Sequence, residues 1–187
     1  MSIDLLEVNG VKCSSIASGI KKKNDLDLSL ISLIEGTQTA AVFTQNIFCA
    51  APVTVAKNHL NSNVKALIIN SGNANAGTGQ KGLEICLKTC EIFAGKLGIE
   101  SDQILPFSTG IIGELLPLDP FEKNTKKLVD GLSSSNMSMV AKGILTTDLV
   151  EKYYSKTFEF DGKVVTLSGV AKGSGMIRPD MATMLSF

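Results

Sequence analysis

The sequence predicts a mixed α/β (α+β) protein in which strands and helices do not alternate regularly. Apolar and polar residues alternate in 27–33 (DLDLSLI), which is the period of a half-buried strand. Apolar residues recur at helical spacing over 83–97, and 157–167 (TFEFDGKVVTL) has the Asp-Gly turn of a β-hairpin. Early strands, middle helices and a late hairpin indicate a mixed fold rather than repeated βαβ units.

The region up to residue 70 reads as short strands. Besides 27–33, we expect strands in the apolar segment 40–44 and in the buried-strand run 64–69 (VKALII). Strand character therefore dominates this region.

A helix is expected after the Gly- and Asn-rich segment 70–79. Its apolar residues recur at three- and four-residue intervals from 83 to 97, and Gly98 supplies a C-terminal stop. Cys86 and Cys90, four residues apart, share one face of this helix. We expect both to be buried thiols, because a free cysteine behaves as a small apolar side chain.

The remaining elements are marked by turn residues and prolines. We expect a strand over 103–107 ending in a turn at 108–110, helices over 120–132 and 137–142, a strand-like segment over 144–148 (ILTTD), and the hairpin over 157–167.

Composition limits the kinds of partner. A chain of 187 residues with 44% hydrophobic residues is long enough for one sizeable core. Its 18 basic and 18 acidic residues give no net charge that would attract nucleic acid or an anionic membrane. Asp4 and Glu7 stand where a signal peptide would carry basic residues, and no apolar run is long enough to span a bilayer. We expect a soluble protein of the cytoplasm, with neither nucleic acid nor membrane as partner.

Histidine and metal chemistry are poorly supported. The four cysteines are too few and too scattered for a disulfide framework or a zinc site. The single histidine, His59, lies in the polar stretch AKNHLNSN and is expected at the surface. An acyl-transfer enzyme of this sequence would need another base, and an α-amino group freed by cleavage before Ser or Thr can serve.

Three segments combine glycine with small polar residues: 70–79 (NSGNANAGTG), 108–113 (STGIIG) and 172–175 (KGSG). Each is compatible with a turn or with a loop that approaches a ligand. Residues 77–82 match GxGxxG, but they follow an Asn-rich loop rather than a strand, and the sequence contains no GxxxxGK[ST]. Nucleotide binding is therefore not expected.

The four motifs NSGNANAGTG, STGIIG, LTTD and KGSGMIRPDMATML, in this order and at these separations, resemble the ornithine acetyltransferase family. These proteins are the bifunctional glutamate N-acetyltransferases and amino-acid N-acetyltransferases of arginine biosynthesis. The resemblance spans nearly the whole chain. It implies the fold shared by ornithine acetyltransferases and related self-processing aminopeptidases, with this chain as its N-terminal half.

The resemblance implies self-cleavage between Ala182 and Thr183. Residues 1–182 would form the α chain, and 183–187 would begin a β chain whose remainder is absent from this sequence. The freed Thr183 would use its hydroxyl as nucleophile and its new amine as general base, in a ping-pong transfer from N-acetylornithine to glutamate.

The same resemblance assigns the other site residues. Thr109 and Gly110 match the oxyanion hole, and Thr146 and Lys172 match substrate-binding positions together with Thr183. Lys172 offers a cation for the α-carboxylate of the substrate. Whether Thr146 or Thr147 faces the pocket stays open, because adjacent residues of a strand face opposite sides.

The resemblance also implies an α2β2 heterotetramer with the β chain as partner and no cofactor or metal. Acetyl-CoA is left open as an additional acetyl donor. We expect the isolated chain to be inactive and to expose an apolar face that the β chain would cover.

Two alternatives remain open. A self-processing aminopeptidase or amidase of the same fold would use water as acceptor, so competition between glutamate and water discriminates it. A non-catalytic truncated subunit would retain the motifs as turns, and the downstream reading frame discriminates that case.

Overall fold

The computed structural model describes residues 5–22, 24–175 and 184–187. The elements in chain order are β1 (Val11–Ile16), β2 (Leu28–Leu33), α1 (Ala51–His59), β3 (Ala66–Asn73), α2 (Gly79–Leu97), a 3-10 turn (Ser101–Gln103), β4 (Ile104–Ile111), α3 (Asp119–Asp130), a second 3-10 turn (Ser134–Asn136), α4 (Met137–Gly143), β5 (Lys152–Phe160), β6 (Lys163–Lys172) and β7 (Leu185–Ser186).

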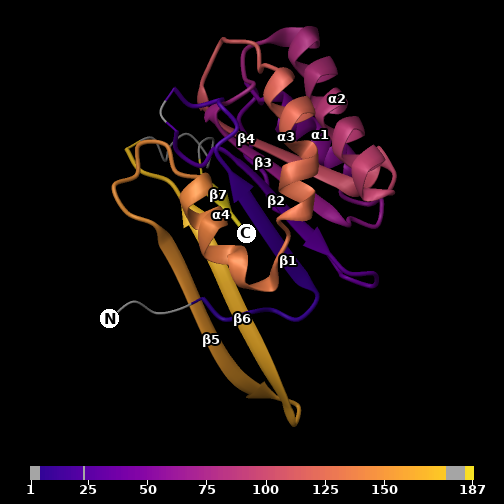
Figure 1. Cartoon of the computed structure of the whole chain (residues 1–187), viewed down its shortest axis with the longest axis vertical. Helices are drawn as coiled ribbons and strands as arrows, with labels where there is room; N and C mark the ends of the chain where they lie inside the picture. The colour runs from indigo at the N-terminus through magenta and orange to yellow at the C-terminus, as the bar shows by residue number, and fades with distance from the viewer. Residues whose placement is uncertain (1–4, 23, 176–183) are drawn as a thin grey trace.

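The main sheet has the strand order β1-β2-β3-β4 (Figure 1). Antiparallel pairing joins β1 to β2 and β2 to β3, whereas β3 and β4 are parallel. Helix α2 supplies the crossover that a parallel pair requires. A single crossover inside a mostly antiparallel sheet confirms the predicted mixed α+β fold.

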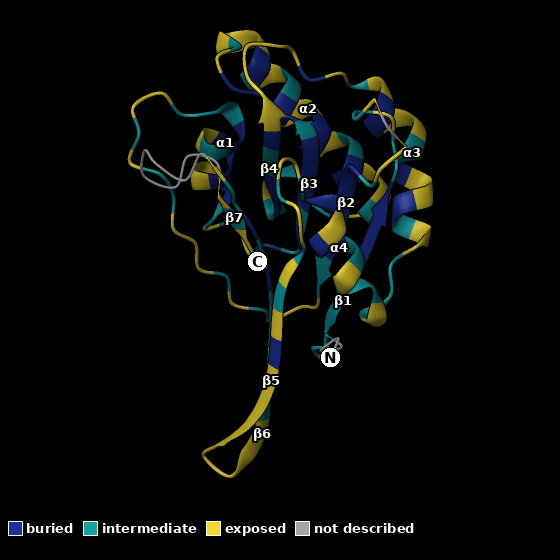
Figure 2. Cartoon of the chain, turned by 90° about the vertical axis from the view of Figure 1, so that its left-hand side faces the viewer, coloured by how far each residue is buried: buried dark blue, intermediate teal, exposed yellow. Residues whose placement is uncertain are grey.

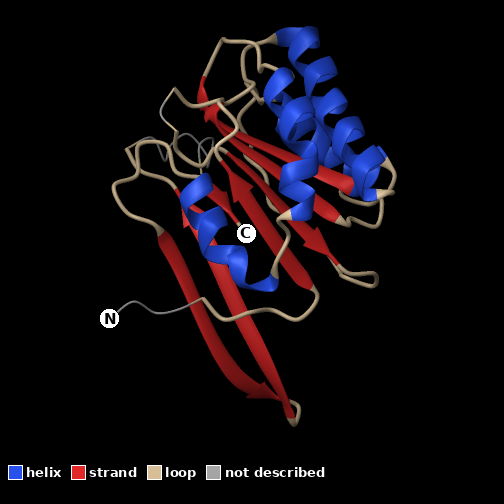
Figure 3. Ribbon diagram, in the orientation of Figure 1, coloured by secondary structure: helices blue, strands red, loops and turns tan. Residues whose placement is uncertain are grey.

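The sheet is covered differently on its two faces. Helices α1, α2 and α3 lie over one face (Figure 3), where Leu28 and Leu30 of β2 join Phe93 of α2 in the larger core. On the opposite face Ile31 packs with residues of α4 and with Val170 of β6. Because successive strand residues point to opposite faces, β2 contributes to both cores.

A long hairpin, β5 and β6, extends away from the body and is mostly exposed along its outer part (Figure 2). Asp161 and Gly162 form its turn with φ of +50° and +69°. A type I′ hairpin turn requires positive φ at both central residues, which Asp-Gly can adopt. The Asp-Gly pair therefore predicted the turn correctly. The predicted hairpin is confirmed and is longer than expected at both ends.

The strand expected over 27–33 is confirmed as β2, and the three expected helices are confirmed as α2, α3 and α4. Gly98 ends α2 in the left-handed conformation, with φ of +69° and its N–H bonded to the Ala94 carbonyl. The expected strand over 64–69 is confirmed as β3, which continues to Asn73 through part of the predicted Asn-rich turn.

Three local predictions were wrong. Residues 40–44 form a surface loop rather than a strand, with Val42 83% exposed, since no strand in the described part of the chain pairs with them. Residues 108–110 are not a turn but part of β4, because they continue the parallel pairing with residues 70–72 of β3. Residues 144–148 are an irregular loop after α4 rather than a strand.

Helix α1 was missed in a region read as strands, and His59 was wrongly placed at the surface. Pro52 lies in the first turn of α1, which is where proline suits a helix. Pro52, Val55, Ala56 and His59 are spaced as one helix face and are all buried. His59 is 9% exposed and its Nδ1 lies 2.8 Å from the Ile104 carbonyl oxygen, so its role is to join α1 to β4.

Candidate active site

A cavity of about 440 Å³ lies where the ends of three segments meet. Strands β3 and β4 contribute Gly72 and the Thr109–Ile111 segment, and the end of β6 contributes Lys172. The lining is Lys21, Gly72, Thr109, Gly110, Ile111, Thr146, Thr147, Lys172 and Ser174. Hydroxyl groups and ammonium groups therefore surround a small space at the end of the sheet.

Lys172 connects two of these segments by hydrogen bonds. Its Nζ donates to Thr109 Oγ1 at 2.9 Å and to Thr146 Oγ1 at 2.8 Å. Lys172 and Thr109 are both buried, 4% and 5% exposed. An ammonium donates up to three hydrogen bonds and accepts none, so the bonds to described residues leave one hydrogen of Lys172 for a further acceptor. Thr146 thus faces the lysine, while Thr147 also lines the cavity.

The charge of Lys172 is disfavoured by its surroundings. Burial lowers its pKa from the usual 10.5, and the positive charges of Lys152 and Lys21 act in the same direction. The carboxylate of Asp148 opposes the shift, although it does not cancel it. An anion entering the cavity would stabilise this buried ammonium.

Asp148 fixes the loop that carries Thr146. Its side chain is fully buried, and Oδ1 accepts hydrogen bonds from Lys152 Nζ and from the Gly173 N–H. Burial raises the pKa of Asp148, but these hydrogen bonds and the charges of Lys152 and Lys172 outweigh it, so the pKa lies below its usual range. Asp148 therefore ties this loop to the end of β6 beside Lys172.

The other end of this loop is fixed by tight packing at Gly143, the last residue of α4. A Cβ there would lie 2.3 Å from Ser15 Oγ and 2.4 Å from Ser29 Oγ. Ser71 Oγ donates a hydrogen bond to the Gly143 carbonyl oxygen. The close approach of α4 to β1, β2 and β3 thus determines where the Thr146 loop begins.

Gly110 must be glycine for two reasons. Its φ is +137°, a conformation that residues with a Cβ rarely adopt. A Cβ would also lie 2.3 Å from the Gly72 carbonyl carbon and 2.6 Å from Asn73 N. This close contact between β3 and β4 places the backbone next to Thr109 on the cavity surface.

The Asn-rich segment 70–79 overlaps the end of β3, and its amides bond the surrounding backbone. Asn75 Nδ2 donates to the Gly82 carbonyl and the Asn75 N–H donates to Asn73 Oδ1. Asn70 is likewise used, donating to the Asn73 carbonyl and accepting from Ser108 Oγ. These amides satisfy backbone groups near the turn that leads into α2, so the turn interpretation holds for the part of the segment after Asn73.

The structure brings together four of the residues singled out from the sequence. Thr109, Gly110, Thr146 and Lys172 all line the one cavity. Ala182 and Thr183, the predicted cleavage site and nucleophile, lie outside the described residues. The described chain resumes at Met184, whose Cα, Cβ and Cγ lie within 4 Å of a Cβ built at Gly173.

Sequence reasoning missed Lys21 and Asp148. Lys21 lies in the polar stretch before β2, which the sequence suggests is a surface loop. Asp148 belongs to the LTTD motif, yet a lone carboxylate in a motif does not reveal that it will be buried. The sequence signal that could have identified Asp148 is its position two residues after Thr146 in the same short motif.

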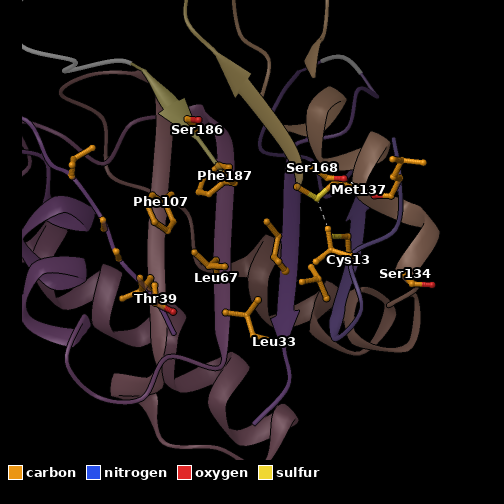
Figure 4. A pocket seen from close by; sticks show the side chains of 18 residues that line it. Cys13, Leu33, Thr39, Leu67, Phe107, Ser134, Met137, Ser168, Ser186 and Phe187 are labelled. Atoms are coloured by element: carbon orange, nitrogen blue, oxygen red, sulfur yellow. Dashed lines mark hydrogen bonds between the residues drawn. The ribbon is translucent and has the colours of Figure 1, made fainter. Parts of the chain in front are cut away.

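An apolar groove lies apart from this cavity, beside the face of the sheet that carries α4 (Figure 4). It has a volume of about 430 Å³ and is lined by side chains such as Leu33, Leu67 and Phe107. Phe187 packs edge-on against Phe107 with 4.9 Å between ring centroids. That the β chain covers an apolar face of this chain stays a prediction.

The remaining sequence expectations concern thiols, metals and membranes. Cys86 and Cys90 are buried as predicted, and burial raises the pKa of Cys90 to about 12. Within residues 5–22, 24–175 and 184–187, no three His, Cys, Asp or Glu side chains are grouped as metal ligands would be. No described helix has the length and apolarity needed to cross a bilayer.

Comparison with known proteins decides the family. The model of the ArgJ family matches residues 12–187. The chain belongs to the ArgJ family. The arginine biosynthesis bifunctional protein ArgJ of Methylococcus capsulatus is 46% identical over 185 residues, and that of Pseudomonas syringae pv. tomato is 44% identical over 180 residues.

The match covers this chain more fully than it covers those ArgJ proteins. It includes 99% and 96% of this chain but 45% and 44% of the two relatives, so the chain spans less than half of their length.

Two solved structures share the fold. The ArgJ of Bacillus halodurans has a TM-score of 0.85 at 34% identity, with 97% of this chain and 98% of that chain covered. The ornithine acetyltransferase of Mycobacterium tuberculosis, solved in complex with ornithine, has a TM-score of 0.80 at 30% identity, with 95% and 93% covered. The predicted family and fold are thereby confirmed.

Proposed function

We propose that the full-length protein transfers an acetyl group from N-acetylornithine to glutamate through an acetyl-threonine intermediate on Thr183. The observation that carries this proposal is the convergence of Thr109, Gly110, Thr146 and Lys172 on one cavity. These residues come from three separate segments, and the sequence resemblance had assigned them to one acetyl-transfer site. Membership of the ArgJ family supports the same reaction.

The first half-reaction acylates the threonine. The Thr183 hydroxyl attacks the acetyl carbonyl carbon of N-acetylornithine while the Thr183 α-amine takes the hydroxyl proton. The C–N bond then breaks, and the proton passes to the departing nitrogen, so that ornithine leaves. In the second half-reaction the glutamate amine attacks the acetyl ester, which releases N-acetylglutamate and restores the hydroxyl of Thr183.

Thr109 and Gly110 would stabilise the negative oxygen of each tetrahedral intermediate. Because the ammonium of Lys172 can only donate, the oxygen of Thr109 accepts that hydrogen bond, and the Thr109 hydroxyl hydrogen stays available. The hydroxyl can then donate to the oxyanion beside the Gly110 N–H. Lys172 in this mechanism orients the Thr109 hydroxyl and contributes positive charge near the oxyanion.

We further propose that cleavage between Ala182 and Thr183 frees the amine that acts as base, dividing the protein into an α chain of 1–182 and a β chain from 183. Coverage figures agree with a division near this point. This chain covers 98% and 93% of the chains in the two solved structures but 45% and 44% of the curated relatives. Leu185, two residues after Thr183, pairs with Lys172 in the sheet.

The two chains are proposed to assemble as a cytoplasmic α2β2 heterotetramer that requires no cofactor. The isolated 187-residue chain is expected to be inactive, because it spans less than half of the length of the curated relatives. The names of the relatives favour acetyl transfer over the aminopeptidase and truncated-subunit alternatives.

The test is an acceptor competition with the full-length protein. We expect ornithine release from N-acetylornithine to depend on glutamate and to yield one N-acetylglutamate per ornithine. The Thr109→Val variant should lose most of this turnover. Ornithine release at an unchanged rate without glutamate would instead indicate that water is the acceptor and would refute the transferase.

A further inference from the structure

Among the described residues, the cavity is lined by two ammonium groups and by no carboxylate. These groups belong to Lys21 and Lys172, and the other described lining residues are uncharged. In the part of the chain that the structure describes, neither lysine forms a salt bridge with Asp or Glu. A site of this kind suits an anionic ligand that approaches both lysines.

Counting hydrogens distinguishes the two lysines. Lys172 donates two of its three ammonium hydrogens to threonine hydroxyls and is almost fully buried. Lys21 is half-buried, and among the described residues its Nζ donates only to the Leu26 carbonyl oxygen, at 2.8 Å. Lys21 therefore has more hydrogens to offer a ligand than Lys172 has.

The position of Lys21 is built into the fold. The buried carboxylate of Asp27, just before β2, accepts hydrogen bonds from the N–H groups of Ser18, Gly19 and Lys21 and from the Ser18 hydroxyl. Four hydrogen bonds to one carboxylate hold the loop in a single conformation. The backbone of Lys21 is thus fixed at the rim of the cavity.

Gly72 makes room for the Lys21 side chain. A Cβ at Gly72 would lie 3.1 Å from Lys21 Cγ, and the φ of Gly72 is +104°. Gly72 is the register partner of Gly110 across β3 and β4. The stem of Lys21 therefore lies against the strand pair that carries the proposed oxyanion hole.

We propose that Lys21 is a specificity-determining residue that, alongside Lys172, binds the α-carboxylate common to the donor and acceptor amino acids. The proposal rests on the proposed acetyl transfer. In both substrates the α-carboxylate is attached to the carbon that bears the reacting nitrogen, so it lies close to the oxyanion residues. A cation near Gly110 suits this carboxylate better than it suits the distant end of the side chain.

Electrostatics agree with this assignment. Burial lowers the pKa of Lys21, and the charges of Asp27 and Asp25 oppose that shift without cancelling it. The charge of Lys21 in turn lowers the pKa of Lys172. A bound carboxylate would stabilise both ammonium groups at once.

The test uses the full-length protein. It removes the positive charge of Lys21 in one comparison and the α-carboxylate of the substrate in the other. Lys21→Met is compared with Lys22→Met, an exposed neighbour that does not line the cavity. Each is assayed with N-acetylornithine and with its carboxamide analogue, which lacks the α-carboxylate. Lys21→Arg tests whether positive charge alone restores binding, and thermal unfolding reports whether the variants are folded.

We expect Lys21→Met to raise KM for N-acetylornithine and for glutamate about tenfold, while kcat changes less than about twofold. With the carboxamide donor, wild type and Lys21→Met should have the same KM. Lys22→Met should match wild type throughout, and Lys21→Arg should recover part of the loss. An equal loss with both donors, or a fall in kcat with unchanged KM, would overturn the proposal.

Failure of the proposed function would be recognised separately. A wild-type protein without acetyl transfer would contradict the function itself. Calorimetric titration of ornithine into wild type and Lys21→Gln would then test Lys21 alone. Weaker binding by the variant would support the carboxylate contact, and equal affinity would refute it.

Discussion

The Lys172 ammonium lies 2.9 Å from the Thr109 hydroxyl oxygen, although the two residues are 63 positions apart in the chain. The same nitrogen bonds Thr146 Oγ1 at 2.8 Å. One buried cation therefore connects the end of β4 with the loop after α4. The proposed oxyanion hole and the proposed substrate pocket are thus parts of one hydrogen-bonded unit.

Thr109→Val should lower kcat by about 10² to 10³, because it removes one oxyanion donor. Lys172→Met should also lower kcat, since the Thr109 hydroxyl loses the donor that orients it. Steady-state kinetics of the full-length variants check both, with Lys163→Met at the exposed hairpin turn as control. Unchanged kcat in Thr109→Val would exclude this hydroxyl from the oxyanion hole.

Gly110→Ala should abolish activity and destabilise the fold. The added Cβ would lie 2.3 Å from the Gly72 carbonyl carbon, and the backbone φ of +137° is unfavourable for alanine. Gly95→Ala is the matched control, since nothing lies within 4 Å of its Cβ and it sits inside α2. That control should gain stability of about 0.5–1 kcal/mol in chemical unfolding. A stable, active Gly110→Ala would contradict the packing described here.

The pH dependence of kcat should have two limbs. Activity should rise as the Thr183 amine loses its proton, near the reference value of about 8 for an α-amino group. At higher pH, activity should fall as Lys172 loses its proton. This fall should begin below pH 10.5, because burial holds the pKa of Lys172 under the usual lysine value. Rate profiles of wild type and Lys172→Met check this, and the variant should lack the limb that Lys172 contributes.

The contribution of Lys172 to the free energy of unfolding should change with pH in the opposite direction to the activity. The pKa of Lys172 is lower in the folded state, so between that value and 10.5 the unfolded chain binds more protons. The contribution of Lys172 to stability therefore increases as pH rises through this window. Unfolding measured across the window in wild type and Lys172→Met separates loss of activity from unfolding. Stability that falls in step with activity would contradict the assignment.

The expected elements that were confirmed are those whose signal is local. The apolar spacing of α2 with Gly98 at its end, and the Asp161-Gly162 turn, specify their structures within a few residues. Residues 40–44 failed because a strand also needs a partner strand, which no local pattern supplies. His59 failed because its polar neighbours hid its position on the inner face of α1.

Part of the candidate site was predicted through motifs and part could not be. Thr109, Gly110, Thr146 and Lys172 were found together because the family resemblance marks each of them. Lys21 depends on long-range geometry, namely the Asp27 hydrogen bonds and the space left by Gly72. Such contacts follow from the fold and are not visible in the spacing of residues.

Cys13, Cys86 and Cys90 should resist alkylation in the native protein. Burial raises the pKa of each thiol, to about 12 for Cys13 and Cys90, so little thiolate forms at pH 8. Cys49 is partly exposed and serves as the internal reference. Peptide mapping after iodoacetamide treatment, with and without denaturant, checks this. Rapid native labelling of Cys86 or Cys90 would refute the burial of that helix face.

The central claim is best tested by intact mass spectrometry of the full-length protein after incubation with N-acetylornithine and without glutamate. We predict two polypeptides, one ending at Ala182 and one beginning at Thr183 that carries a single acetyl group, which glutamate then removes. Thr183→Ala should remain one uncut, unacetylated chain. An uncut wild-type chain, or a cut chain that never acquires the acetyl group, would contradict the account.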